Sequence, residues 1–198
     1  ALDVEKFITQ EINFDPSGKE LVLAFSGGAD SKALFYIMLV LAPRLNFTLS
    51  LAHLDHALRE TSAAEAEDAK KLAQEHGLTC HVSRMDVAAL SQKLKLGAEE
   101  AGRVARLEFM EHLKRKAAKE GIDRWILFGH QLNDLAEDVV MRLVRGSGWP
   151  ALGGMRGIDE ARRHLRPLLL TGRADIEKFL TSLKADWVKD PMNEDPAY

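Results

Sequence analysis

The sequence has almost no cysteine, no long apolar run and little excess charge. Cys80 is the only cysteine among 198 residues, which rules out an internal disulfide and a cysteine cluster for zinc or iron–sulfur ligation. No apolar run is long enough to span a bilayer and no signal segment opens the chain, so we expect a cytoplasmic protein without membrane contact. The net charge of −3 gives no global positive field, so any RNA contact would need a local basic patch.

The most informative stretch lies at residues 21–31, where an apolar segment of strand length runs into Ser26-Gly27-Gly28-Ala29-Asp30-Ser31. Apolar residues then recur at helical spacing as far as Leu41, which predicts a strand, a tight loop and a helix that ends near Pro43. The first amides of a helix lack intrahelical partners and suit a phosphate. A carboxylate at Asp30 beside phosphates indicates a divalent cation between them.

This loop resembles the SGGxDS loop of the PP-loop ATP pyrophosphatases, which cleave ATP between the α and β phosphates and attach AMP to a substrate oxygen. It is not a Walker loop, because the G-x-x-x-x-G-K-[ST] spacing is absent. An ordinary glycine-rich turn is the alternative. The resemblance implies ATP and Mg²⁺, with the nucleotide held by Ser26, Gly27, Gly28, Ala29, Asp30 and Ser31.

Hydrophobic periodicity outside this loop predicts an α/β fold. We expect further strands at 47–54, 78–83 and 124–129, and helices at 2–12, 60–76, 96–120, 130–145 and 171–183. With 46% hydrophobic residues the chain suits one domain over 1–198. This order predicts a doubly wound domain with a mainly parallel sheet of about five strands, helices on both faces and ATP at the carboxyl edge.

The second strand ends in polar residues that a ligand at this edge would meet. The segment from His53 to Arg59 resembles the H-V-D-H-G-L-R strand end of the tRNA(Ile)-lysidine synthetases, with mild departures at Leu54 and Ala57. The resemblance places His53, Asp55 and His56 at the nucleotide. Histidines bonded to nearby backbone are the alternative, and a metal site is disfavoured because a third well-spaced ligand is not evident.

The helix expected at 96–120 carries two candidate catalytic arginines. Its start resembles G-x-E-x-x-A-R-x-x-R-Y, in which the arginines face ATP and the anticodon nucleotide, and this implies Arg103 and Arg106. Surface pairing of Glu99 with an arginine, worth about 0.3–0.5 kcal/mol, is the alternative. Gly102 stands where the family has Ala, and Leu107 where it has Tyr, so an aromatic substrate contact is lost.

The fourth strand runs into a segment that resembles G-H-x-x-D-D-Q-x-E-T. The departures from that pattern are Asn133, Leu135 and Asp138. The resemblance places Gly129 and His130 at the nucleotide, makes Asp134 and Glu137 catalytic, and lets Asp134 share the metal with Asp30. Helix capping by acids near a helix start is the alternative.

Three further segments complete the resemblance. Arg145-Gly146-Ser147-Gly148 resembles R-G-S-G-x-x-G-L-x-x-M and offers a second phosphate cradle, with a flexible linker as the alternative. Arg162–Leu169 resembles an I-R-P-L-L strand, and Trp187–Asp195 resembles W-x-x-D-P-S-N-x-D.

Five collinear motifs from Leu21 to Asp195 imply the lysidine synthetase ligase reaction. The C2 oxygen of the wobble cytidine of tRNA(Ile), which has a CAU anticodon, would attack the α phosphate of ATP, and L-lysine would then displace AMP. The C-terminal tRNA-binding domains that the family carries are not within these 198 residues, and a homodimer is left open.

Three alternatives remain open at this stage. The first is a PP-loop enzyme for another tRNA base or a small molecule, which Asn133, Leu135 and Leu107 suggest. Thiolation of the cysteine-dependent kind is disfavoured because Cys80 stands alone. The third is a nucleotide-binding module whose catalysis has decayed.

Overall fold

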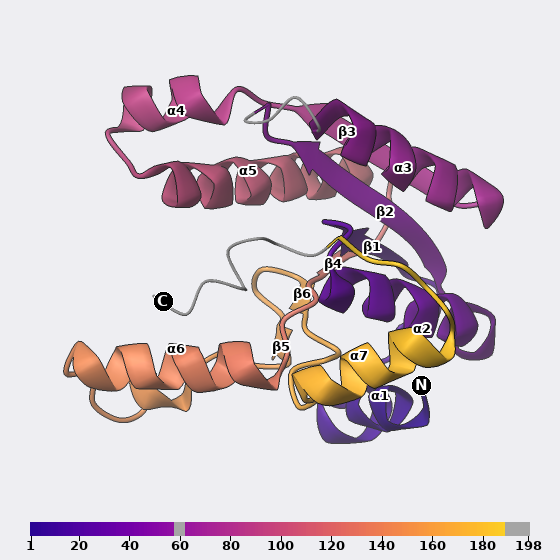
Figure 1. Ribbon diagram of the computed structural model, residues 1–198. Helices are drawn as coiled ribbons and strands as arrows, with labels where there is room; N and C mark the ends of the chain where they lie inside the picture. Colours follow the sequence, from indigo (N-terminus) through magenta and orange to yellow (C-terminus); the bar gives the residue numbers. More distant parts are fainter. Residues whose placement is uncertain (58–61, 189–198) are drawn as a thin grey trace. The chain divides into compact units, whose positions relative to one another are not determined.

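The computed structural model describes residues 1–57 and 62–188 (Figure 1). Its strands are β1 (Glu20–Ala24), β2 (Thr48–Asp55), β3 (Thr79–Arg84), β4 (Arg124–Leu127), β5 (Ile158–Asp159) and β6 (His164–Leu165). Its helices are α1 (Leu2–Lys6), α2 (Ala29–Leu45), α3 (Ser62–Glu75), α4 (Val87–Leu94), α5 (Ala98–Lys119), α6 (Leu132–Val144) and α7 (Arg173–Ser182), with a π-helical turn at Phe7–Glu11 and a 3₁₀ turn at Ala151–Gly153.

The strands form one sheet in the order β3-β2-β1-β4-β6-β5. Strand β2 pairs in parallel with both β1 and β3, whereas β5 and β6 are antiparallel. The predicted α/β fold with a mainly parallel sheet is confirmed, with six strands where about five were expected. No helix in the described part of the chain combines the length and apolar character that crossing a bilayer requires.

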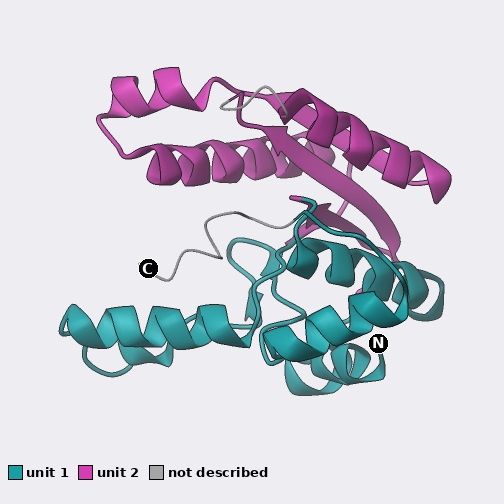
Figure 2. Ribbon diagram, viewed as in Figure 1, with its two compact units in different colours: residues 1–15, 27–45, 127–198 teal, residues 16–26, 46–126 magenta. Residues whose placement is uncertain are grey.

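The chain divides into two compact units (Figure 2). The first, which is magenta and labelled unit 2 in Figure 2, consists of residues 16–26 and 46–126 and contains β1, β2 and β3 with α3, α4 and α5. Helix α3 contacts β2 and β3 through a narrow buried stripe of Ala66, Ala69 and Ala73. Because alanine side chains are short, the helix backbone packs close to the strands.

The second unit consists of residues 1–15, 27–45 and 127–198. It contains α1, α2, α6, α7 and the β5–β6 hairpin, and α7 packs against α2. Its fully buried side chains include Ile8, Leu34, Phe35, Met38, Leu165 and Leu180. Helix α2 is therefore held on its apolar side by a continuous core, and its first turn directly follows the glycine loop at residues 26–28.

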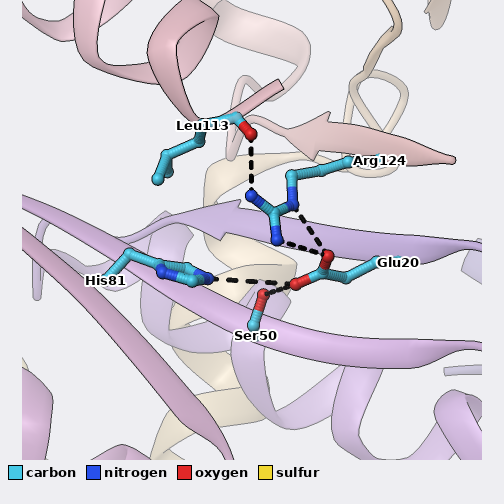
Figure 3. Close-up of polar contacts among 5 residues, drawn as sticks. All are labelled: Glu20, Ser50, His81, Leu113 and Arg124. Atoms are coloured by element: carbon cyan, nitrogen blue, oxygen red, sulfur yellow. Dashed lines mark hydrogen bonds and ion pairs between the residues drawn. The ribbon is translucent and has the colours of Figure 1, made fainter. Parts of the chain in front are cut away.

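A buried ion pair holds together the strand starts of the first unit (Figure 3). The Arg124 Nε and Nη2 groups lie 2.7 Å from Glu20 Oε2, and Arg124 Nη1 donates to the Leu113 carbonyl at 2.7 Å. Ser50 Oγ donates to the other Glu20 oxygen at 2.9 Å, and His81 Nε2 lies 3.9 Å from it. Burial raises the pKa of Glu20, but His81, Arg124 and Ser50 outweigh burial and lower it to about 2.

Most of the expected elements are confirmed within a few residues, and three features were not predicted. Helix α4 and strand β5 had no clear pattern, and α2 continues past Pro43 to Leu45. Pro43 has no N–H to donate to the carbonyl four residues earlier, but only two residues of the helix follow it. The predictions that fall on Arg59 and on residues 189–195 concern positions outside the described residues.

Candidate active site

The loop after β1 bends sharply into α2. Gly27 has a φ of +82°, a left-handed conformation that favours glycine. The Gly28 carbonyl accepts hydrogen bonds from Ser31 Oγ and from the Lys32 N–H, both at 3.0 Å. The Gly27 carbonyl accepts a hydrogen bond from the Val188 N–H at 3.1 Å. A segment of the same unit that is distant in sequence therefore holds the loop in place.

The amides at the start of α2 differ in their surroundings. The parallel bridge between Gly28 and Val188 joins the Val188 N–H to the Gly27 carbonyl and, by the pattern of such a bridge, the Ala29 N–H to the Val188 carbonyl, whereas the described residues show no backbone acceptor for the Asp30 N–H. These amides lie at the positive end of the helix dipole, where phosphate binds readily. The loop therefore has the capacity to bind an anion that its sequence predicts.

Asp30 is a half-buried carboxylate in an unfavourable environment. One of its oxygens, Oδ1, is buried and has no hydrogen-bond partner. Burial and, secondarily, the charge of Asp134 raise the pKa of Asp30, Arg173 lowers it, and Glu177 raises it. A bound cation would offset both the cost of burying the Asp30 charge and its repulsion from the Asp134 charge.

Gly129 lies against the backbone of the loop. A Cβ atom at this position would lie 3.2 Å from the Asp30 carbonyl carbon and from the Ser31 nitrogen. Glycine lets the chain after β4 approach the loop this closely without a shift, because a Cβ atom would push the loop backbone away by a few tenths of an ångström. The next residue, His130, places its ring 5.6 Å from that of Phe128.

Asp134 caps the helix on which it lies. Its Oδ2 accepts a hydrogen bond from the Gln131 N–H at 2.7 Å, and the Gln131 side chain accepts from the Asn133 N–H at 2.8 Å. This reciprocal arrangement is a capping box, which was the alternative interpretation of this acid. Capping engages one carboxylate oxygen, and the charge of the group still acts on Asp30.

Two charged residues near Asp30 were missed by the sequence analysis. Arg173 and Glu177 lie one turn apart on α7, with Arg173 Nε donating to Glu177 Oε1 at 3.0 Å. Both change the pKa of Asp30. The start of this helix was predicted, but nothing in the local sequence indicates that α7 packs beside α2.

The carboxylates of this unit fit a magnesium ion that is shared with phosphates. In the described residues, no group of three His, Cys, Asp or Glu side chains is arranged to hold a metal ion. Mg²⁺ in nucleotide-using enzymes takes one or two carboxylates and completes its shell with phosphate oxygens and water. The unpartnered Asp30 oxygen, with Asp134 nearby, matches that donor set.

Helix α6 and the turn that follows it carry the remaining candidates of this unit. Glu137, in the first half of the helix, is exposed. The Gly146 and Ser147 amides donate to the carbonyls of Leu143 and Arg142 at 2.9 Å, so they close the end of the helix. These two amides are therefore not available as donors in the predicted phosphate cradle at 145–148.

In the first unit, the predicted nucleotide contacts His53 and Asp55 form polar contacts with groups of the protein. His53 Nδ1 lies 3.0 Å from the Phe25 carbonyl, so this nitrogen carries the hydrogen. Asp55 is buried, accepts from the Ala57 N–H at 2.8 Å and lies 3.5 Å from Arg84 Nε. A hydrogen bond from Ser62 lowers the pKa of Asp55, burial raises it, and the Ala57 amide and Arg84 lower it further. Both residues stabilise the end of β2.

His56 has a different environment in the same unit. Its Nδ1 is buried and has no hydrogen-bond partner, and its ring lies 3.6 Å from where a Cβ of Gly102 would be. Burial lowers the pKa of His56, and the positive charge of Arg106 lowers it further. The Arg106 side chain is exposed in part, yet desolvation lowers the pKa of its guanidinium. This places a neutral imidazole beside a cation.

The surroundings of Arg103 match a surface ion pair more closely than the predicted catalytic arginine. Its Nη1 lies 4.0 Å from Glu100 Oε2, one turn earlier on α5, and both side chains are mostly exposed. Arg106, and not Arg103, shares its surroundings with His56.

Comparison with known proteins agrees with this geometry. A family model described as a PP-loop domain matches residues 2–198. The chain belongs to the PP-loop domain family. The family resemblance predicted from the glycine loop is thereby confirmed.

This PP-loop domain is similar to curated tRNA(Ile)-lysidine synthases. The protein of Nitratidesulfovibrio vulgaris is 49% identical over 177 residues, which are 89% of this chain and 50% of that protein. The protein of Thermosipho africanus is 32% identical over 197 residues, which are 98% of this chain and 45% of that protein. The PP-loop domain thus spans half or less of the length of these relatives.

Solved structures share the fold at low sequence identity. The U34-tRNA thiolase NcsA from Methanococcus maripaludis, described with its [4Fe-4S] cluster, superposes with a TM-score of 0.74 at 18% identity, covering 98% of this chain and 65% of that one. An NH3-dependent NAD synthetase from Campylobacter jejuni superposes with a TM-score of 0.56 at 17% identity, covering 98% and 80%. These likenesses concern the fold alone.

Leu135, one of the departures from the family pattern, has a structural explanation in this PP-loop domain. Its Cδ1 would lie 3.1 Å from a Cβ atom at Gly154, as would Val139 Cγ2. Leu135 therefore packs α6 onto the loop that follows it.

Proposed function

We propose that this chain is the ATP-using part of a tRNA(Ile)-lysidine synthase. The observation that carries the proposal is the loop at the start of α2, which combines a glycine-paired turn into the helix with a buried, unpartnered oxygen of the Asp30 carboxylate. The similarity to curated synthases supports the choice of reaction. The relatives are at least twice as long as the matched segment, so the reaction and its substrates belong to the proposal.

The loop would hold the pyrophosphate part of ATP. Amides at the start of α2 would donate to phosphate oxygens, and Gly27 would let the backbone approach without a side chain between them. Bonds from Ser31, Lys32 and Val188 to the loop carbonyls keep these oxygens from meeting the phosphates. A loop fixed before ATP arrives does not have to be ordered during the reaction.

Asp30 and Asp134 would hold Mg²⁺, which when bound neutralises charge on the departing pyrophosphate. Asp30 gains from this arrangement because its raised pKa reflects burial near another acid. The capping bond to Gln131 fixes the orientation of Asp134. The prediction that Asp134 and Glu137 orient the lysine ammonium and help to remove its proton stays part of the proposal.

Arg106 is the better candidate for the arginine that stabilises charge on the α phosphate. Both arginines are exposed, but desolvation lowers the pKa of the Arg106 guanidinium, and Arg103 already lies 4.0 Å from the Glu100 carboxylate. Arg106 would therefore interact more strongly with a phosphate. The C2 oxygen of the wobble cytidine would attack the α phosphate and release pyrophosphate. The lysine amine would then attack C2, lose a proton and expel AMP.

A sulfur-transfer reaction like that of the structurally similar thiolase is less well supported. That protein is described with a [4Fe-4S] cluster, whereas Cys80 is the only cysteine in this chain. Burial raises the pKa of the Cys80 thiol, so it is a poor nucleophile.

Mass analysis of the modified nucleoside tests the proposal. The chain is incubated with ATP, Mg²⁺, L-lysine and a tRNA(Ile) transcript with a CAU anticodon, and the digested nucleosides are weighed. We expect cytidine at the wobble position to gain the mass of lysine minus water, with one AMP released per modified base. ATP turnover with an unmodified cytidine would contradict the proposed substrate and favour another PP-loop reaction.

A further inference from the structure

The chain returns to the glycine loop after α7. The Ala185 amide donates to the Leu180 carbonyl at 3.1 Å, which closes the end of the helix. Three residues later, Val188 forms an isolated parallel bridge with Gly28. We call residues 186–188 the strap, and Figure 1 shows it in yellow at the end of the segment that leads away from α7.

The strap has little slack. Between Ala185, which is hydrogen-bonded to α7, and Val188 the chain can span at most about 11 Å. Helix α7 packs against α2, and its Ile176 and Leu180 side chains are buried. The helix, the strap and the loop all belong to one compact unit. The strap therefore ties the loop to a helix that is itself held in place.

The peptide between Gly27 and Gly28 is the part of the loop that the strap holds. In the described part of the chain, the backbone donor to the Gly27 carbonyl is the Val188 N–H, at 3.1 Å. The Gly28 carbonyl, by contrast, is held within the turn by Ser31 and Lys32. Glycine adopts positive and negative φ at similar cost, so a peptide between two glycines turns over easily unless an outside contact fixes it. The strap supplies that contact.

The orientation of this peptide decides what a phosphate would meet. The C=O and N–H of a trans peptide point in opposite directions. With the Gly27 carbonyl turned toward the strap, the Gly28 N–H is turned away from it. In a reversed peptide the carbonyl oxygen would take the place of that N–H, and a phosphate would meet an acceptor in place of a donor. The Val188 side chain also contacts the loop, since its Cγ2 lies 3.5 Å from where a Cβ of Gly27 would be.

We propose that Val188 is a positioning residue of the phosphate-binding loop and acts through its backbone N–H. By holding the Gly27 carbonyl, it keeps the Gly28 N–H directed at the pyrophosphate of ATP. This inference rests on the proposed function, because it takes pyrophosphate as the ligand of the loop.

Isothermal titration of inorganic pyrophosphate, ATP and AMP, each with Mg²⁺, tests the inference on the whole chain. Val188→Pro removes the N–H. We expect it to weaken the binding of pyrophosphate and of ATP roughly tenfold, because only a fraction of the molecules then carries the loop in the binding orientation. AMP lacks the pyrophosphate and should bind the variant and the wild type equally. Val188→Ala keeps the N–H, so this matched control should bind all three ligands like the wild type.

Three further measurements separate positioning from a loss of folding. Val188 is 54% exposed, so Val188→Pro should change the melting temperature little. A backbone ester at position 188 removes the same N–H, keeps the valine side chain and should reproduce the loss of affinity. Without any ligand, the amides of residues 28–32 should exchange hydrogen faster in Val188→Pro, whereas the amides within α7 should keep their wild-type rates.

The outcomes distinguish this inference from the proposed function. Equal pyrophosphate affinities of the wild type and Val188→Pro would overturn the inference and leave the proposed function intact. Equal losses in Val188→Ala and Val188→Pro would also overturn it, because the side chain and not the N–H would then be responsible. So would a loss of AMP affinity as large as the loss of ATP affinity. A wild-type chain that binds neither ATP nor pyrophosphate overturns the proposed function, and the inference fails with it.

Discussion

Gly129 and Asp30 approach each other so closely that a Cβ atom at position 129 would lie 3.2 Å from the Asp30 carbonyl carbon. The chain after β4 and the start of α2 therefore share one packing contact at the proposed phosphate site. The spacing of these two residues controls the position of the loop amides.

Gly129→Ala should weaken ATP binding. The added methyl group meets backbone atoms, which must move by a few tenths of an ångström and displace the amides that would bind phosphate. We expect roughly a tenfold loss of affinity, about 1.4 kcal/mol, measured by isothermal titration. Gly102→Ala is the control, since its Cβ would make ordinary contact at 3.6 Å with His56. Gly102 lies inside α5, so this change should raise stability by about 0.5–1 kcal/mol and leave ATP affinity unchanged. Equal affinity in the two variants would contradict the packing argument.

Asp30→Asn should stabilise the nucleotide-free protein at pH 7. The pKa of Asp30 is raised in the folded state, so ionisation of this group opposes folding above that pKa. The penalty disappears below the unfolded value of 3.8, and the advantage of the variant should disappear there too. Each 1 kcal/mol gained raises the melting temperature by about 2–4 °C in a chain of this size. Asp68→Asn, an exposed acid on α3, should leave the melting temperature unchanged at both pH values. A lower melting temperature for Asp30→Asn at pH 7 would contradict the proposed strain.

Glu20→Gln should destabilise the protein because it leaves the buried Arg124 without its carboxylate. The folded pKa of about 2 lies below the unfolded value of 4.5, so the stabilisation is complete above pH 4.5 and is lost as pH falls toward 2. This shift corresponds to on the order of 3 kcal/mol at neutral pH. Urea unfolding at pH 7 and near pH 3 measures the difference, which should be smaller at the lower pH. Glu67→Gln, whose ion pair with Lys70 is exposed, should cost less than about 1 kcal/mol. A loss as small as that of the control would show that the pair contributes little.

His56 should titrate below the ordinary histidine value of 6.5, so it is neutral at pH 7. Removing the nearby positive charge by Arg106→Gln should raise its pKa, whereas Arg103→Gln should not. Side-chain NMR titration of the histidine resonances measures both effects. An unchanged His56 pKa in Arg106→Gln would show that Arg106 does not act on His56, and would contradict the choice of Arg106 over Arg103.

Much of the fold follows from the sequence because its signals are local. Alternating and helical apolar spacing marked the strands and most helices, and the glycine pair at 27–28 marked the loop. Helix α4 is short, and the β5–β6 hairpin has two residues in each strand, so neither is long enough to show a period. Their positions depend on tertiary contacts.

The candidate site was predictable residue by residue but not in its contacts. Asp30 and its loop could be identified from residue type and spacing. The proximity of Arg173 and Glu177 arises from the packing of α7 beside α2, about 140 positions apart in the chain, and leaves no local trace. Spacing alone likewise could not decide that Asp134 caps α6 or that the amides of Gly146 and Ser147 end it.

Calorimetric titration of ATP, with and without Mg²⁺, into the wild-type chain and Asp30→Asn tests the central claim most directly. We expect the wild type to bind ATP tightly only with Mg²⁺, and the variant to lose that dependence and most of its affinity while it remains folded. If Asp30→Asn binds Mg²⁺–ATP as tightly as the wild type, Asp30 does not hold the metal and the proposed site is wrong.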